Sequence, residues 1–334
     1  MSLELRPVHE RDHDAVVRLF AHYPFKAWQK RVQGIDGGRL AALLWDLAEP
    51  LFAKPQTSAL VAWRGRPREA VGLGVVTPHA WHSEVFGRRM GRIAQFVNAF
   101  DPEAVGPPLL DRLLADARAA GLEMLAGRVD GQDWPNVQLF ESRGFRCVDC
   151  SLKLARRLDD LPRDKPSALP RGLSIRPYEP SDLEAVQRIA VRSHTRNHFY
   201  NDPRLDRAQA ARLFQLWLDR CAGGLAEFIL VAEAEDSRVC GFVTALSNRA
   251  MARVVGLSVG IIDYIVVDCA MGGRGIGRAL LDAALRRLGR EHPWAELRTS
   301  HDNYPAVDFY GAAGFRLVAS DLVFHRWEPA PAGR

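Results

Sequence analysis

The stretch VVDCAMGGRGIGRALLDAAL, residues 266–285, places four glycines between an apolar run and a helix-like one. The apolar residues of 260–268 predict a strand, and the apolar spacing of 278–288 predicts a helix. Glycine loses more backbone freedom on folding than any other residue, so this loop needs a structural reason. Either the chain turns tightly here with positive φ, or the N–H groups at the start of the helix receive an anion such as a diphosphate.

The bulk composition is that of a soluble globular protein with room for two domains. The chain has 334 residues, of which 47% are hydrophobic and 25% are charged. A net charge of +5 suits an anionic small molecule and is too small to predict nucleic-acid binding. The apolar stretch 254–267 is shorter than a membrane span and contains Asp263, and the charged N-terminus does not resemble a signal peptide. We therefore expect no membrane insertion and a cytoplasmic location.

The five cysteines predict neither a disulfide framework nor a metal site. Cys147 and Cys150 form a C-x-x-C motif, but a zinc ribbon needs a second pair, which the sequence lacks. The surrounding RCVDCSLKL alternates as a strand does, whereas a redox motif normally opens a helix. We expect structural cysteines, a reducing compartment and no bound metal.

Two segments of the chain recur at one fixed offset of 170 residues. LELRPVHERDHDAVVRLF (3–20) aligns with LSIRPYEPSDLEAVQRIA (173–190), and DWPNVQLFESRGF (133–145) aligns with NYPAVDFYGAAGF (303–315). Two separate pairs that share one offset predict a duplicated domain. The segment 158–172, rich in proline and charge, predicts a linker. We expect one domain over 1–157 and another over 173–330.

Strand and helix patterns alternate within each copy. In the second copy they predict strands at 173–177, 228–234, 240–248, 260–268, 296–300 and 315–327, and helices at 181–193, 206–222, 278–288 and 303–313. This order predicts an α/β fold (an α+β mixed sheet) with helices covering the sheet.

The glycine loop and a second motif together resemble the GCN5-related N-acetyltransferase (GNAT) family. The second motif, N-x-x-A-x-x-x-Y-x-x-x-G-F, occupies 303–315. In that family a loop of the form Arg/Gln-x-x-G-x-G/A grips the diphosphate of acetyl-coenzyme A. Gly275 and Gly277 match its glycines, whereas Gly272 stands where Arg or Gln is usual. The resemblance implies two tandem GNAT-like domains with acetyl-CoA as co-substrate, because the backbone donors of the loop remain.

The resemblance also implies which residues act. The strand before the loop splays from its neighbour, and the pantetheine arm adds along its backbone, with the Ile265 N–H near the thioester carbonyl. Tyr310 matches a tyrosine that is often the general acid for the departing thiolate, and a phenol of ordinary pKa, about 10, is protonated at neutral pH. Asn303 either caps its helix or hydrogen-bonds the cofactor. The implied cofactor-binding set is Ile265, Val266, Val267, Gly272, Gly273, Arg274, Gly275, Ile276, Gly277, Arg278, Asn303 and Tyr310.

Asp263 lies inside the apolar strand, where an unpaired carboxylate is costly. Strict alternation places its side chain on the same face as Ile261 and Ile265. Two interpretations remain open. Asp263 either holds the substrate amine and takes its proton, directly or through water, or it pairs with an arginine of a neighbouring strand.

The first copy lacks the parts that the resemblance requires. Its counterpart of the glycine loop, DPEAVGPPLLDRLL (101–114), has one glycine and two consecutive prolines. Phe140 stands in place of Tyr310, and Asp133 stands in place of Asn303. A phenyl ring has no proton to give to a thiolate, and an aspartate repels a diphosphate. We expect the first domain to be degenerate and not catalytic.

Two further segments, 79–93 and 193–220, resemble the acetyltransferases that act on TDP-linked 4-amino sugars, such as dTDP-fucosamine acetyltransferase. The matching residues are Trp81, Ser83, Phe86, Gly87, Arg196, Phe199, Asp202, Pro203 and Trp217. A nucleotide-linked sugar needs cations for its diphosphate and an aromatic ring for its base or sugar, and the segment 192–200 supplies both. The expected acceptor-binding residues are Arg196, His198, Phe199, Tyr200 and Asp263.

Other functions stay open. The acceptor is alternatively another amine, on a protein, an antibiotic or a mycothiol-type precursor, because tandem copies with one degenerate half also occur among mycothiol-type acetyltransferases. The chain is alternatively a non-catalytic module that binds acyl-CoA, although the intact second motif with Tyr310 argues against this. The sequence does not predict the oligomeric state, and a homodimer is compatible with it.

Overall fold

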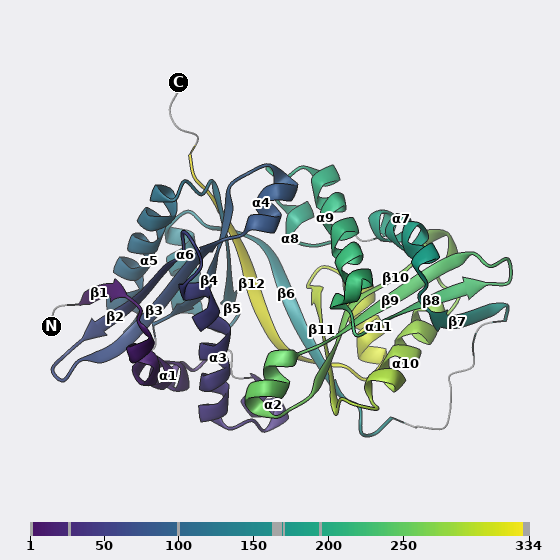
Figure 1. Cartoon of the computed structure of the whole chain (residues 1–334), viewed down its shortest axis with the longest axis horizontal. Helices are drawn as coiled ribbons and strands as arrows, with labels where there is room; N and C mark the ends of the chain where they lie inside the picture. Colours follow the sequence, from purple (N-terminus) through teal and green to yellow (C-terminus); the bar gives the residue numbers. More distant parts are fainter. Residues whose placement is uncertain are drawn as a thin grey trace. The chain divides into compact units, whose positions relative to one another are not determined.

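A computed structural model describes residues 3–25, 28–98, 101–161, 169, 171–193 and 196–329. The chain forms two compact units (Figure 1). The first comprises Met1–Ser151 with Ala319–Arg334, and the second comprises Leu152–Val318. Most of the expected linker 158–172 lies outside the described residues. The expected α/β fold with a mixed sheet is confirmed.

The first unit is a mixed sheet with helices on both faces. Its elements are β1 (Glu4–Pro7), α1 (His13–His22), α2 (Trp28–Gln33), α3 (Gly37–Phe52), β2 (Ser58–Arg64), β3 (Glu69–Pro78), α4 (Ala80–Phe86), β4 (Met90–Val97), α5 (Pro102–Ala119), β5 (Met124–Asp130), α6 (Trp134–Ser142) and the start of β6 (Arg146–Arg157). The strand order is β1-β2-β3-β4-β5, and only β4 and β5 are parallel among these neighbours. Helices α1 and α3 pack on one face of the sheet, and α5 and α6 pack on the other.

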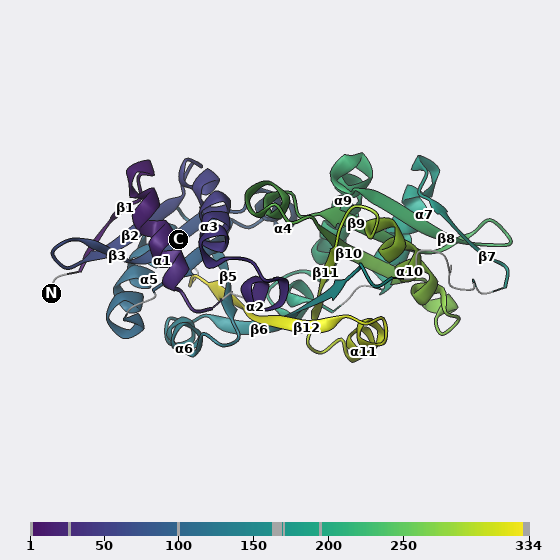
Figure 2. The ribbon, with the colours of Figure 1, turned by 90° about the horizontal axis from the view of Figure 1, so that it is seen from below.

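The second unit repeats this arrangement. Its elements are the end of β6, β7 (Leu173–Pro177), α7 (Leu183–Ser193), α8 (His198–Asn201), α9 (Arg207–Arg220), β8 (Phe228–Ala234), β9 (Val239–Ser247), β10 (Val259–Val267), α10 (Ile276–Leu288), β11 (Trp294–Ser300), α11 (Tyr304–Ala312) and the start of β12 (Arg316–Trp327). The strand order is β11-β10-β9-β8-β7. Helices α7 and α9 pack on one face, and α10 and α11 pack on the other (Figure 2).

The predicted duplication is visible element by element. Strands β2 and β8, strands β5 and β11, and helices α6 and α11 begin and end at positions that differ by 170. An ion pair recurs at the same offset. Arg6 Nη2 lies 2.7 Å from Asp12 Oδ1, and Arg176 Nη2 lies 2.9 Å from Asp182 Oδ1. In both units this pair ties the first strand to the start of the helix that follows it, so the same local chemistry builds both sheet edges.

The last strand of each sequence copy is shared between the units. Strand β6 begins in the first unit, but residues from Leu152 belong to the second, and strand β12 returns to the first unit at Ala319. Residues 321–327 of β12 pair antiparallel with β5. On β6, Lys153 Nζ donates to Glu296 Oε2 of β11 at 2.7 Å. The compact units therefore differ from the ranges 1–157 and 173–330, because strand pairing over long separations is not encoded in local sequence patterns.

Replacement of Phe324 tests whether the end of β12 completes the core of the first unit. Phe324 is fully buried in the core of the first unit, 5.7 Å from the Phe140 ring, although it comes from the second sequence copy. We expect Phe324→Ala to destabilise the first unit by about 3–5 kcal/mol, because it removes a buried ring and leaves a cavity. Hydrogen exchange should show lost protection in β4 and β5, with β10 unaffected.

Leu154→Ala is the matched control, since Leu154 precedes Phe324 by the repeat offset and is buried in the core of the second unit. This variant should loosen β11 rather than β5. Loss of protection in β10 and β11 on replacing Phe324 would show that β12 does not complete the first unit.

Candidate active site

Strands β10 and β11 separate part-way along their length. They pair in parallel only where Val259–Ile262 lies beside Trp294–Leu297, whereas β10 remains paired with β9 as far as Val267. Within the described residues, the parallel pairing of β10 with β11 therefore stops at Ile262, before the end of β10. Where two neighbouring strands separate in this way, an extended ligand can add along the strand backbone.

A β-bulge coincides with the point of separation. Ile262 is opposite Ala245 and Tyr264 is opposite Thr244, so Asp263 is an extra residue in β10. Ile262 and Ile265 pack towards α10, whereas Tyr264 packs towards α7 and α9. A bulge places two successive residues against one partner residue, so the side chains that follow it point to the opposite faces of the sheet from those that regular alternation predicts.

The bulge overturns one prediction about Asp263. Strict alternation put its side chain on the face of Ile265, but the carboxylate contacts α9 instead. Trp217 Nε1 donates to Asp263 Oδ2 at 2.8 Å, and Thr244 Oγ1 donates to the same oxygen at 3.1 Å. The alternation rule fails here because it assumes a regular strand.

The surroundings of Asp263 also exclude the predicted arginine partner. The Sγ atom of Cys221 lies 4.0 Å from Oδ2, and burial raises the pKa of this thiol to about 12, so it stays protonated. In the part of the chain that the structure describes, Asp263 forms no ion pair with a lysine, arginine or histidine. Burial raises the pKa of the Asp263 carboxyl, and the hydrogen bonds from Trp217 and Thr244 oppose this shift.

The glycine loop leads into a helix whose first turn has no side-chain cap. Gly273 and Gly275 have φ of +75° and +78°, and Gly275 is the N-cap residue of α10. Since no side chain accepts from the first turn, the N–H groups of residues 276–278 face outward from the helix end. Gly277 follows in that turn, where an added Cβ would meet Val267 and Phe309 at ordinary contact distances. The turn and the anion site, left as alternatives by the sequence, are therefore compatible.

The two arginines of the loop differ in their surroundings. Arg278 Nε donates to Asp282 Oδ2 at 3.0 Å, and its Nη1 donates to the Ala312 carbonyl at 3.0 Å. Its guanidinium is thus directed towards the end of α11, although its backbone N–H remains in the first turn. Arg274 is exposed beside Gly273 and Gly275 and contributes a positive charge at the mouth of the loop.

Helix α11 brings Tyr310 into the same core as the loop helix. Tyr310 is 8% exposed and packs with Ile276, Ile265 and Phe315. Burial raises the pKa of the phenol, so it is protonated throughout the neutral range. Asn303 stands at the N-cap position of α11, but its side chain caps nothing and its Nδ2 donates to Thr299 Oγ1 at 3.4 Å. The capping role predicted as one alternative for Asn303 is therefore absent.

Rings from three elements form a series that ends at Tyr264, the residue after Asp263. The Tyr200 ring of α8 lies parallel to Phe214 of α9, with centroids 6.3 Å apart, and Phe214 lies 6.0 Å from Tyr264 of β10. The guanidinium of Arg207 lies over Tyr200 at 5.4 Å. Aromatic faces beside a carboxylate suit an acceptor that carries both a ring and an amine.

The other predicted acceptor residues have different positions. Phe199 is buried, so it supports α8 from within, and the His198 ring lies 4.0 Å from it. Arg196 is exposed, and its Nη1 donates to the Asp302 carbonyl at 3.2 Å, just before α11. His194, at the centre of the predicted segment, lies outside the described residues.

Sequence reasoning missed the partners of Asp263. Trp217 stands out in the sequence only as a match to the amino-sugar acetyltransferases, and Thr244 and Cys221 carry no signal there. The position of Trp217 four residues before Cys221 puts both on one face of a helix, but only the fold brings that face to β10.

Comparison with known proteins identifies the domain that holds this geometry. The model of the acetyltransferase (GNAT) family matches residues 184–315. Residues 184–315 are therefore similar to the GNAT acetyltransferases. The expectation of an enzyme is thereby confirmed at the level of the family.

Curated relatives differ in what they are named for. The spore coat polysaccharide biosynthesis protein SpsD of Bacillus subtilis is 27% identical over 159 residues, which are 47% of this chain and 52% of that protein. A mycothiol acetyltransferase of a Nocardioides species is 29% identical over 233 residues, 66% of this chain and 76% of that protein. The chain thus matches about half the length of the first relative, and the acceptor is not determined by these matches.

Solved structures show the same fold over the whole chain. A GCN5-related N-acetyltransferase from Sphaerobacter thermophilus has a TM-score of 0.69 at 17% identity and covers 98% of this chain and 97% of its own. A tandem GNAT protein from the clavulanic acid biosynthesis pathway has a TM-score of 0.60 at 16% identity, covering 99% and 100%. The tandem arrangement of two GNAT-like folds is therefore confirmed.

The first unit keeps the frame of a GNAT domain. Strand β4 stops pairing with β5 at Ile93, and a bulge in β4 makes Ala94 the extra residue. Phe140, at the position of Tyr310, is fully buried and packs against Phe96 and Phe145. Neither the carboxylate nor the phenol of the second unit has a counterpart here.

Polar side chains fill the end of β4 in the first unit. The amides of Asn98 and Asn136 exchange two hydrogen bonds of 2.8 Å, and Asn136 Nδ2 donates to Asp133 Oδ2 at 2.7 Å. The hydroxyl of Tyr23 donates to the same carboxylate. All four side chains are buried, so polar groups hydrogen-bonded to one another occupy this part of the first unit.

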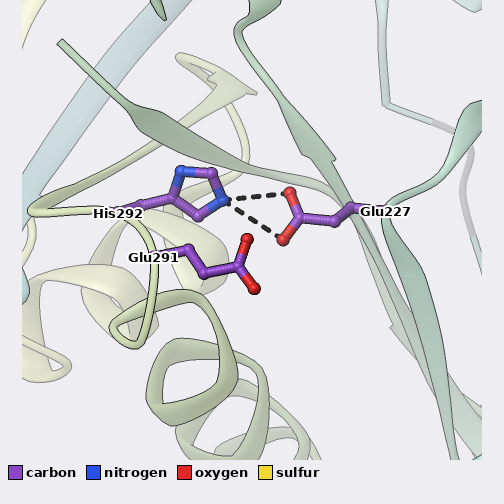
Figure 3. A group of neighbouring side chains, drawn as sticks. All are labelled: Glu227, Glu291 and His292. Atoms are coloured by element: carbon purple, nitrogen blue, oxygen red, sulfur yellow. Dashed lines mark hydrogen bonds and ion pairs between the residues drawn. The ribbon is translucent and has the colours of Figure 1, made fainter.

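A histidine and two glutamates form a separate group in the GNAT domain (Figure 3). Glu227, Glu291 and His292 each place one potential ligand atom within 4.8 Å of the others. The His292 Nε2 atom lies 3.0 Å from Glu227 Oε2, and its Nδ1 lies 2.7 Å from Ser258 Oγ. Both ring nitrogens are thus engaged by protein groups, and the expectation of no metal stays a prediction.

Two alanine substitutions separate the roles of the loop glycines. Gly275→Ala should lower the free energy of unfolding by about 1–2 kcal/mol, because alanine resists the positive φ of this N-cap. Gly277→Ala should leave it unchanged or raise it by up to about 1 kcal/mol, because alanine favours a helix and its Cβ fits. Urea unfolding without ligand measures both variants. Equal effects of the two substitutions would contradict the assigned loop geometry.

Proposed function

We propose that the chain transfers an acetyl group from acetyl-CoA directly to the primary amine of a nucleotide-linked amino sugar of the TDP type. The observation that carries the donor half is the early end of the β10–β11 pairing at Ile262, on a strand that leads through the glycine loop to the start of α10. Extended backbone suits the amide-containing pantetheine arm, and the helix N-terminus suits a diphosphate. The donor-binding residues are those predicted from the sequence, with the loop contributing backbone N–H groups and the charge of Arg274.

The chemistry assigns one role to each nearby group. The acceptor nitrogen attacks the thioester carbon, the C–S bond breaks, and the nitrogen loses a proton. The N–H of Ile265 stabilises the oxyanion, because a preoriented backbone donor acts at the carbonyl oxygen where charge develops. Asp263 receives the proton of the amine, and Tyr310 gives its proton to the departing thiolate. Both groups then exchange protons with water, so each turnover begins from the same state.

Burial suits both residues to these roles. The raised pKa of Asp263 makes it a stronger base than an ordinary aspartate. The raised pKa of Tyr310 keeps its proton in place until a thiolate develops. The lack of a cationic partner for Asp263 among the described residues also favours the ammonium form of an amine as the group that approaches it.

Support for a nucleotide-linked sugar comes from the acceptor side. The rings of Tyr200 and Phe214 place aromatic surface on the α8–α9 side of the sheet for a base or sugar, and the exposed Arg196 offers a cation for phosphate. The Bacillus subtilis relative is named for spore coat polysaccharide biosynthesis, which agrees with a sugar acceptor. The mycothiol acetyltransferase relative favours a second candidate, the amine of a mycothiol-type precursor.

Further parts of the proposal concern surroundings and assembly. Within the described residues, every helix is too short or too polar to cross a membrane. We propose a cytoplasmic enzyme that acts on a small molecule, and a homodimer is compatible with this role. Nucleic acid is not an expected partner, since the net charge of +5 is modest for a chain of 334 residues.

A panel of amines distinguishes the acceptors. Thiol release from acetyl-CoA should be fastest with TDP-linked 4-amino sugars, slower with UDP-linked ones and slowest with free amino sugars, peptides or a mycothiol precursor. Arg196→Ala should raise KM for the nucleotide sugar about tenfold and leave KM for acetyl-CoA unchanged, because one phosphate contact is lost. Arg212→Ala is the control, because Arg212 is also an exposed arginine but lies on α9. Turnover of a mycothiol precursor or a peptide, with no turnover of any nucleotide sugar, would replace the proposed acceptor.

Replacement of Tyr310 tests the general acid. Tyr310→Phe should reduce kcat about 100-fold at unchanged KM for acetyl-CoA, since the ring still packs but no proton is available. The exposed Tyr304 on the same helix provides the control, and Tyr304→Phe should retain full activity. Full activity in Tyr310→Phe would remove this role from the mechanism without affecting the fold.

A further inference from the structure

The two oxygens of the Asp263 carboxylate have different surroundings. The Oδ2 atom accepts from the indole of Trp217, from the hydroxyl of Thr244 and, at the longer distance of 4.0 Å, from the thiol of Cys221. The Oδ1 atom accepts from no group among the described residues. Three donors from three elements therefore converge on one oxygen of the bulged residue.

We propose that Trp217 is a positioning residue for this reaction: with Thr244 it holds Oδ2 of Asp263, so that Oδ1 is the oxygen that takes the proton from the acceptor amine. This inference rests on the proposed function, in which Asp263 is the base. It adds a residue that acts through Asp263 and contacts neither the thioester nor the nitrogen.

Both donors come from well-anchored elements. Trp217 lies in the last turn of α9, beside Leu218, which is buried against α7 and the sheet. Thr244 is fully buried in β9, directly opposite Tyr264. The bulge supplies the third constraint, because it turns Asp263 away from the face of Ile265. Hydrogen bonds to an ionised acceptor are short and directional, and together they restrict the rotation of the carboxylate.

The neutrality of these donors matters for catalysis. An arginine in place of Trp217 would hold the carboxylate equally well but would make it a much weaker base. Neutral donors orient the group and lower its pKa only enough to oppose part of the effect of burial. The carboxylate is therefore oriented without the strong loss of basicity that a cationic partner would cause.

The proton transfer balances without any further reactant. An ammonium N–H bond breaks, an O–H bond forms at Oδ1, and the neutral nitrogen keeps the electron pair that attacks the thioester carbon. Once the C–N bond has formed, the nitrogen gives its second proton to water and the C–S bond breaks. The acid form of Asp263 later releases its proton to water. The thiolate takes its proton from Tyr310, which regains one from water.

Titratable neighbours do not replace Asp263 in the neutral range. Cys221 and Tyr264 lie next to it, and burial raises the pKa of both. Arg220 acts on the Cys221 thiol in the opposite direction to burial, and the pKa of Tyr200 on α8 is likewise raised by burial. The acidic limb of a pH–rate profile therefore reports on the Asp263 carboxyl.

Trp217→Phe is the decisive variant, because it keeps an aromatic ring in α9 and removes only the donor. We expect kcat to fall about tenfold with little change in KM for acetyl-CoA. The acidic limb of the kcat profile should move to higher pH, since the lost hydrogen bond stabilised the ionised form of Asp263. Thr244→Val should act in the same direction, and Thr244→Ser, which keeps the hydroxyl, should restore the profile. A loss caused by poorer packing alone would leave the position of the limb unchanged.

Trp294→Phe is the matched control, because the Trp294 indole contacts Arg157 on the other side of β11 and does not touch Asp263. The double variant Trp217→Phe, Asp263→Asn should be no slower than Asp263→Asn alone, since Trp217 acts through the carboxylate. Additive losses, or an unmoved acidic limb in Trp217→Phe, would overturn the proposal.

Failure of the positioning role is distinguishable from failure of the proposed function. If the wild type is active and Trp217→Phe keeps the same pH profile, only the positioning role of Trp217 is disproved. If the wild type is inactive with every amine, the proposed function itself is disproved. NMR titration of ¹³C-labelled aspartate, with the resonance assigned by its loss in Asp263→Asn, gives a readout without turnover. The Asp263 pKa should be higher in Trp217→Phe than in the wild type, and an unchanged value would contradict the inference.

Discussion

The geometry of the candidate active site in the second unit depends on one extra residue in β10, Asp263. At Asp263 the strand bulges, parallel pairing with β11 stops, and the following side chains change face. The same residue thereby opens a backbone edge towards β11 and turns a carboxylate towards α9. A regular strand would pair along its whole length with the strands on both sides. It would not separate from β11 part-way, and it would not turn this carboxylate towards the helices α7 and α9.

The comparison of the two units separates what the fold needs from what the chemistry needs. The first unit has a bulge at Ala94 and the same early end of parallel pairing, so the frame survives without a carboxylate. There the polar network around Asp133 fills the end of the strand, and Phe140 completes a fully apolar core. A buried network that satisfies all its members is stable, which explains how a degenerate GNAT-like domain persists beside a complete one.

The environment of Asp263 is informative because burying a charged group is costly unless partners compensate it. Its partners, Trp217 and Thr244, are neutral, so they orient the group without cancelling its charge. An enzyme that must bind a cationic amine and then deprotonate it benefits from such an arrangement. The aromatic series from Tyr200 ends at Tyr264, next to this carboxylate in the sequence of β10, and adds apolar surface on the same face of the sheet.

The sequence by itself determined the duplication, the mixed α/β fold and the glycine loop before α10. These features are local or repeat at a constant offset, so a single chain displays them without its three-dimensional structure. Tertiary structure alone decided the face of Asp263, its neutral partners and the sharing of β6 and β12 between the units. Each of these depends on which strands and helices meet over long sequence separations, and a one-residue bulge reverses an alternation pattern that looks regular in the sequence.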